Sequence, residues 1–116
     1  MMLKTIPELL QEAKKNVRCI SAIVAASEIK ENHGLLVDVR EPSEHLEKAA
    51  AGAINIPRGL LEMKLMEIEK DPLRAIYLHC ATSARAILSA EQLARIGYQK
   101  VSVITCNMDT IQQNCQ

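Results

Sequence analysis

Apolar runs and helical periodicities follow one another along the chain. Short, nearly continuous apolar segments bounded by glycine, proline or polar residues are typical of strands buried on both faces. They predict strands at residues 17–20, 35–39, 53–56, 75–78 and 101–105. Apolar positions at helical spacing predict helices at residues 5–15, 22–31, 59–70 and 84–96, and from Met108 onward. Strands that alternate with helices imply βαβ units, so we expect a three-layer α/β/α fold around a central, mostly parallel sheet of about five strands.

The first predicted helix carries its own start signals. Thr5 can cap it, and Glu8 completes a capping box. Its apolar residues fall on one face at helical spacing: Ile6, Leu9, Leu10 and Ala13. This stripe predicts docking either on the rest of the domain or on a second copy of the chain, which would make a homodimer. We therefore divide the chain into an N-terminal helical extension, residues 1–18, and one domain, residues 19–116.

Composition excludes several classes of function. Lysines and arginines number 14 and aspartates and glutamates 14, whereas a nucleic-acid-binding protein needs a surplus of cations. Aromatic residues are 2% of the chain, so base stacking is not expected either. No apolar run approaches the length of about 18 residues that crosses a bilayer, and residues 1–15 lack an apolar secretory core. We expect no nucleic-acid partner, no membrane association and a cytoplasmic location.

One of the four cysteines has neighbours that point to chemistry. The cysteines form no CxxC pair, so neither a metal site nor a thioredoxin-type redox pair is predicted: Cys19, Cys80, Cys106 and Cys115. A buried strand leads into Cys80, and a helix begins before Arg85. Free amides at a helix start, together with the helix dipole, favour an anion such as a thiolate. We therefore expect a nucleophilic Cys80 rather than a buried structural cysteine, in an anion-binding loop made of Ala81, Thr82, Ser83, Ala84 and Arg85.

Three motifs occur in order along the chain: Leu-Val-Asp-Val-Arg-Glu at 36–41, Gly-Ala-Ile-Asn-Ile-Pro at 52–57 and Cys-Ala-Thr-Ser-Ala-Arg at 80–85. Together they resemble the single-domain rhodaneses, a sulfurtransferase family, over residues 21–111. The resemblance implies that Cys80 takes sulfane sulfur from a donor such as thiosulfate, becomes a persulfide and passes the sulfur to a thiophilic acceptor. It implies no metal and no organic cofactor. The partners would be a small sulfur-containing anion or a protein persulfide or thiol.

Three further residues could support this site. Asp38 and Arg40 match the family's Asp-Val-Arg-Glu segment, and we expect an internal ion pair or loop brace in preference to substrate contact. Arg58 could add positive charge to the rim, although an exposed arginine is the more common outcome. His79 precedes the nucleophile but should point to the opposite face of the sheet, so we assign it no catalytic role.

Departures from the family pattern favour a second interpretation. Residues 48–51 differ from the usual Gly-His-Ile-Pro segment, and the chain ends soon after Ile111. Ser83 stands where the loop often has glycine, which matters if that position needs positive φ. Ala81 leaves Arg85 as the loop's only cation, so thiosulfate should bind weakly. The alternative function is a low-activity rhodanese-fold sulfur carrier or a regulatory protein-interaction module.

A third interpretation is phosphatase or arsenate reductase chemistry. Related architectures hold tetrahedral oxyanions in a loop with five residues between cysteine and arginine. Four residues separate Cys80 from Arg85. The shorter loop suits a single sulfur atom better than a phosphoryl group, so we rank sulfur transfer higher.

Overall fold

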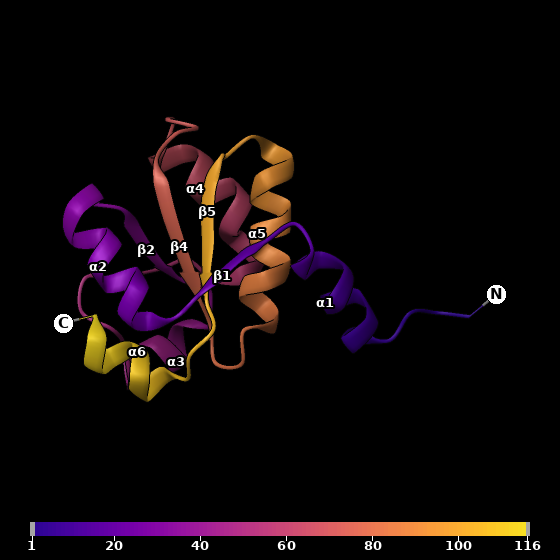
Figure 1. The fold of residues 1–116 in the computed structure, drawn as a ribbon, viewed down its shortest axis with the longest axis horizontal. Coiled ribbons are helices and arrows are strands. Elements are labelled where there is room, and N and C mark those ends of the chain that lie inside the picture. Colours follow the sequence, from indigo (N-terminus) through magenta and orange to yellow (C-terminus); the bar gives the residue numbers. More distant parts are fainter. Residues whose placement is uncertain (1, 116) are drawn as a thin grey trace.

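A sheet of five parallel strands forms the centre of the molecule in the computed structural model, which describes residues 2–115 (Figure 1). The strands are β1 (Arg18–Ile20), β2 (Leu35–Asp38), β3 (Ile54–Asn55), β4 (Ala75–His79) and β5 (Lys100–Ile104). They lie in the order β1-β5-β4-β2-β3, and each neighbouring pair is parallel. The predicted α/β fold is confirmed, and β4 takes the central position.

Helices cover both faces of this sheet. They are α1 (Ile6–Lys14), α2 (Ala22–Asn32), α3 (Pro42–Glu47), α4 (Leu61–Ile68), α5 (Ala84–Ile96) and α6 (Met108–Asn114). α4 and α5 pack on one face and α2 and α6 on the other (Figure 1). Successive strand residues alternate between the two cores: Val37 and Leu78 lie under α4 and α5, whereas Leu36 and Tyr77 lie under α2 and α6. No helix within residues 2–115 is long and apolar enough to span a membrane.

The N-terminal helix packs on its own chain. The hydroxyl of Thr5 accepts the amide of Glu8 at 3.2 Å, and the Glu8 carboxylate accepts the amide of Thr5 at 3.3 Å, which is the predicted capping box. Ala13 is fully buried, and Leu10 packs against the same core as α5. Within this chain, α1 therefore packs against α5, and docking on a second copy stays a prediction.

Helix α3 is absent from the elements predicted by apolar periodicity. None of its six residues is buried, so it has no apolar face that such a pattern could reveal. It forms instead because Pro42 occupies the first turn and the Glu44 carboxylate accepts the amide of Glu41 at 2.9 Å. The predicted helix at 59–70 is also shorter than expected, because a 3-10 turn at Arg58–Leu60 precedes α4.

Backbone hydrogen bonds join the loops at the carboxyl ends of the central strands. The Val39 amide donates to the His79 carbonyl at 3.0 Å, which links the ends of β2 and β4. The Arg58 amide donates to the Val39 carbonyl, also at 3.0 Å, and brings in the segment after β3. Three segments that are distant in sequence therefore meet at one edge of the sheet, where ligands of parallel α/β proteins usually bind.

Candidate active site

Cys80 lies directly after β4, at the start of the loop that leads into α5. Its side chain is 1% exposed and belongs to the core under α4 and α5. Its Sγ accepts a hydrogen bond from the amide of Ala86 at 3.3 Å. Ala86 is in the first turn of α5, where amides lack a partner within the helix. The sulfur therefore occupies the helix-start position that the sequence indicates.

The loop between Cys80 and α5 depends on a left-handed residue. Ser83, the N-cap of α5, has φ +72° and ψ −19°, and its side chain makes no capping hydrogen bond. The position therefore needs the positive φ that glycine adopts most easily. Within residues 2–115, Ala86 provides the one backbone hydrogen bond to the Cys80 sulfur, and it lies one residue beyond the predicted loop at 81–85. The Ala81, Thr82, Ser83 and Ala84 amides make no hydrogen bond to this sulfur.

Arg85 is paired with a carboxylate that the sequence analysis missed. Its Nη1 donates to Oε1 of Glu44 at 2.7 Å and its Nη2 donates to Oε2 at 3.0 Å. The hydrogen bonds from Arg85, aided by the Glu41 amide, lower the pKa of Glu44 to about 2. The same pair raises the pKa of Arg85. The signal that could have revealed Glu44 is the Glu-Pro-x-Glu helix start at 41–44.

Asp38 and Arg40 form a buried ion pair behind the site. Arg40 donates from Nε and Nη2 to the carboxylate of Asp38, and His45 Nδ1 lies 2.9 Å from Oδ2 of the same group. Burial by itself would raise the pKa of Asp38, but the hydrogen bonds from Arg40 and His45 outweigh it and lower that pKa. Arg40 also donates to the carbonyl of Lys48 at 2.5 Å. These contacts make the pair a brace for the loops.

Arg58 is also paired. Its Nη1 donates to Oε1 of Glu62, one helical turn later, at 2.8 Å. Each of the three arginines that the sequence places near the site therefore has a carboxylate of its own: Asp38 for Arg40, Glu62 for Arg58 and Glu44 for Arg85. The structure brings the predicted residues to one edge of the sheet, but it leaves none of these cations without a counter-charge.

Comparison with known proteins decides the family. The family model of the rhodanese-like domain matches residues 21–114. The chain belongs to the rhodanese-like family. A sulfurtransferase of Allochromatium vinosum is 33% identical over 67 residues, which are 58% of this chain and 61% of that protein. The matched region thus spans about three-fifths of that relative's length.

Solved structures agree with the rhodanese-like fold. The polysulfide-sulfur transferase homodimer of Wolinella succinogenes is 27% identical and superposes with a TM-score of 0.75, over 90% of this chain and 80% of that one. A protein of Rhodopseudomonas palustris, described as a possible tyrosine phosphatase, superposes with a TM-score of 0.81 over 97% of this chain and 92% of that one. Its 21% identity shows a shared fold and nothing more.

His79 lies on the opposite side of the rhodanese-like sheet from Cys80. It is register partner to Asp38 and is fully buried, and neither ring nitrogen has a hydrogen-bond partner. Burial lowers the pKa of His79 to about 4, even though Asp38 acts in the other direction. The imidazole is therefore neutral near pH 7.

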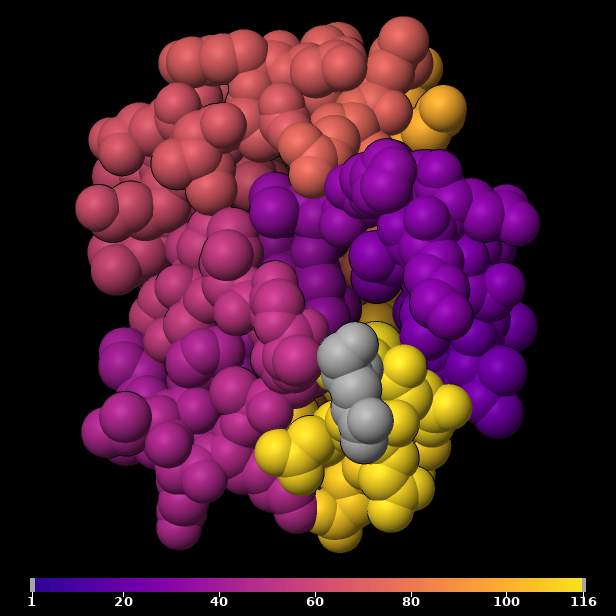
Figure 2. All heavy atoms as spheres, turned by 90° about the vertical axis from the view of Figure 1, so that its left-hand side faces the viewer, coloured from indigo at the N-terminus to yellow at the C-terminus, as the bar shows by residue number. Residues whose placement is uncertain are grey.

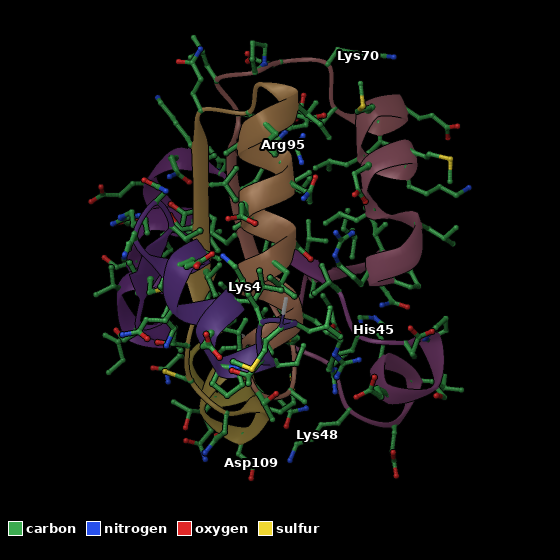
Figure 3. The ribbon with its side chains drawn as sticks, turned by 90° about the vertical axis from the view of Figure 1, so that its right-hand side faces the viewer. Lys4, His45, Lys48, Lys70, Arg95 and Asp109 are labelled. Carbon is green, nitrogen blue, oxygen red and sulfur yellow. The ribbon has the colours of Figure 1, made fainter. Side chains whose placement is uncertain are left out.

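The unusual segment at 48–51 is held by α6 in this rhodanese-like domain. Lys48 forms an ion pair with Asp109, and both side chains lie along the lower edge of the view in Figure 3. Gln112 Nε2 donates to the Ala49 carbonyl at 3.1 Å, and the Ala51 amide donates to the Cys115 carbonyl at 3.1 Å. The segment and the terminal helix therefore form one connected unit, which the Lys48 carbonyl joins to Arg40 of the Asp38–Arg40 brace.

Two hollows of the surface lie away from Cys80. A groove of about 650 Å³ opens on the face seen in Figure 2, between α2, the segment around Gly52 and the end of α6. A smaller hollow of about 280 Å³ lies between the ends of α4 and α5, lined in part by Met66 and Tyr98. Cys80 lines neither. Within residues 2–115, no three metal-ligating side chains converge on one point.

Proposed function

We propose that this rhodanese-like domain is a sulfurtransferase that carries sulfane sulfur on Cys80 as a persulfide. The observation that supports it is the hydrogen bond from the Ala86 amide to the Cys80 sulfur at the start of α5. An amide of a helix first turn stabilises an anion in contact with it. The family match and the sulfurtransferase relative are consistent with this chemistry.

The proposed reaction is a double displacement. The Cys80 thiolate attacks the sulfane sulfur of the donor, and the donor's own bond to that sulfur breaks, so its electron pair leaves with the remainder of the donor. An acceptor thiolate then attacks the outer sulfur of the persulfide and releases Cys80 as a thiolate. Both steps conserve charge and need no external oxidant or reductant. The outer sulfur would lie about 2 Å beyond Sγ, close to the free amides of the α5 first turn.

Mass spectrometry of the intact protein tests this proposal. After incubation with thiosulfate, polysulfide or glutathione persulfide, we expect a mass gain of one sulfur atom on Cys80 and its loss on addition of a thiol acceptor. Cys80→Ser should lose the gain, whereas Cys19→Ser, which removes an exposed cysteine, should keep it. Absence of the gain with all three donors would reject the proposal.

One observation favours the alternative of a carrier or regulatory module with little turnover. The arginines near the site are all paired, and Cys80 is 1% exposed, so neither charge nor access favours rapid exchange of small anions. Single-turnover and steady-state rates separate the two functions. A carrier loads Cys80 in a single turnover but passes the sulfur to small thiols slowly, so its steady-state rate is much lower than its single-turnover rate. An enzyme has a steady-state rate close to its single-turnover rate.

A further inference from the structure

Glu44 on α3 holds Arg85, the arginine that ends the loop after Cys80. We propose that Glu44 determines the donor class: by pairing with Arg85, it makes the site select persulfide donors of the form R–S–SH over the thiosulfate dianion. This inference rests on the proposed function, because it concerns the donor that loads Cys80.

The Glu44–Arg85 pair is fixed from both sides. Two parallel hydrogen bonds of 2.7 and 3.0 Å join the guanidinium fork to the two carboxylate oxygens. The Oε1 of Glu44 also accepts the Glu41 amide at 2.9 Å, which holds the carboxylate at the start of α3. A charged fork-to-fork pair of this kind is stronger than an ordinary hydrogen bond and has a defined orientation. Arg85 therefore cannot turn toward a donor without losing both bonds.

The charges around Arg85 make the site unfavourable for a dianion. Arg85 directly precedes Ala86, whose amide donates to the Cys80 sulfur, and the Glu44 carboxylate holds its guanidinium. The Glu44 carboxylate therefore offsets this one cation, while the loop residues between Cys80 and Arg85 carry no charge. Within residues 2–115, Arg40 and Arg58 cannot compensate, since Asp38 and Glu62 already hold them.

The two donor classes place different demands on this site. Thiosulfate enters with two negative charges, and sulfite leaves with two when the thiolate takes the outer sulfur. A persulfide reacts as Cys80–S⁻ plus R–S–SH, giving Cys80–S–SH plus R–S⁻, so neither the reacting disulfur group nor the leaving sulfur carries more than one negative charge. The paired Arg85 offers little net positive charge. The pairing therefore weakens binding of the thiosulfate dianion more than binding of a persulfide donor.

Removing the charge of Glu44 tests the inference. Glu44→Gln keeps a side chain that can still cap α3, because glutamine serves at this position as glutamate does. We expect kcat/KM for thiosulfate to rise about tenfold relative to that for glutathione persulfide, chiefly through KM, which corresponds to about 1.4 kcal/mol. This rise in the kcat/KM ratio should become smaller as the salt concentration increases, because salt screens the charges. Glu47→Gln is the matched control: it is an exposed carboxylate on the same helix, and it should leave the ratio unchanged.

A second variant covers the case in which Glu44→Gln fails to fold. Glu41 is exposed and makes no hydrogen bond to Arg85, but its charge helps to raise the pKa of Arg85, so Glu41→Gln should shift the ratio in the same direction by a smaller factor. If Cys80 becomes persulfidated but neither variant changes the donor ratio, the role of Glu44 is refuted and the proposed function stands. If no donor loads Cys80 in the wild-type protein or the variants, the proposed function itself fails, and the inference with it.

Discussion

Asp38 and Arg40 form an ion pair that is closed off from solvent at the end of β2. The two side chains are 0% and 6% exposed, and Arg40 donates to both carboxylate oxygens. Removal of one partner leaves a buried charge without its counter-ion, which costs about 3–5 kcal/mol. We therefore expect Asp38→Asn to lower the free energy of unfolding by roughly that amount, measured by urea denaturation.

The control for this pair is an exposed one. Lys4 and Glu12 are both more than half exposed, so Glu12→Gln should change stability little. The double variant Asp38→Asn with Arg40→Gln should be less destabilised than the sum of the two single variants. Strict additivity would show that the pair does not act as a unit.

His79 should make stability depend on pH in the weakly acidic range. Its pKa is about 4 in the folded protein, because burial disfavours the charged form, against an ordinary value of 6.5. Between these values the unfolded chain binds the proton that the folded protein excludes. Stability should therefore be complete above about pH 6.5 and fall as the pH drops toward 4, by on the order of 3 kcal/mol in total.

His79→Leu tests the source of this pH dependence. Leucine has a similar volume and leaves no unpaired ring nitrogens, so stability at pH 7.5 should be equal or higher. Its free energy of unfolding should vary less between pH 6.5 and 4. The exposed His33 provides the control, and His33→Asn should retain the wild-type slope. An unchanged slope in His79→Leu would contradict the assignment.

The lowered pKa of Asp38 contributes at lower pH, because its stabilisation is lost only as the pH falls below about 4.

Ser83 should tolerate glycine and reject a β-branched residue. Its φ of +72° is one that a β-branched side chain adopts only with strain. Ser83→Val should lower the free energy of unfolding by about 1–2 kcal/mol and slow persulfide formation on Cys80, because the loop would shift. Ser83→Gly should change stability by less than about 1 kcal/mol, since relief of strain offsets the greater entropy of the unfolded chain. Thermal unfolding and single-turnover loading of Cys80 measure both effects. Equal behaviour of the two variants would argue against a strained loop.

Local patterns were sufficient to locate the elements of the sheet. The run before Cys80 forms β4, and the helix predicted at 84–96 is α5 with the same bounds. The capping box of Thr5 and Glu8 also follows directly from the sequence. Such features depend on neighbours within a few residues, so residue type and spacing carry the necessary information.

The sequence by itself also determined that Cys80 lies at a helix start with Arg85 five residues later, because strand, loop and helix are contiguous there. Only the tertiary structure decided that Arg85 is neutralised by Glu44, which is 41 residues away on a helix without an apolar face. It likewise decided that the ring nitrogens of His79 have no partners. Whether a charge is free or paired depends on which loops come together at the sheet edge. The periodicity of a single segment does not predict these contacts between distant loops.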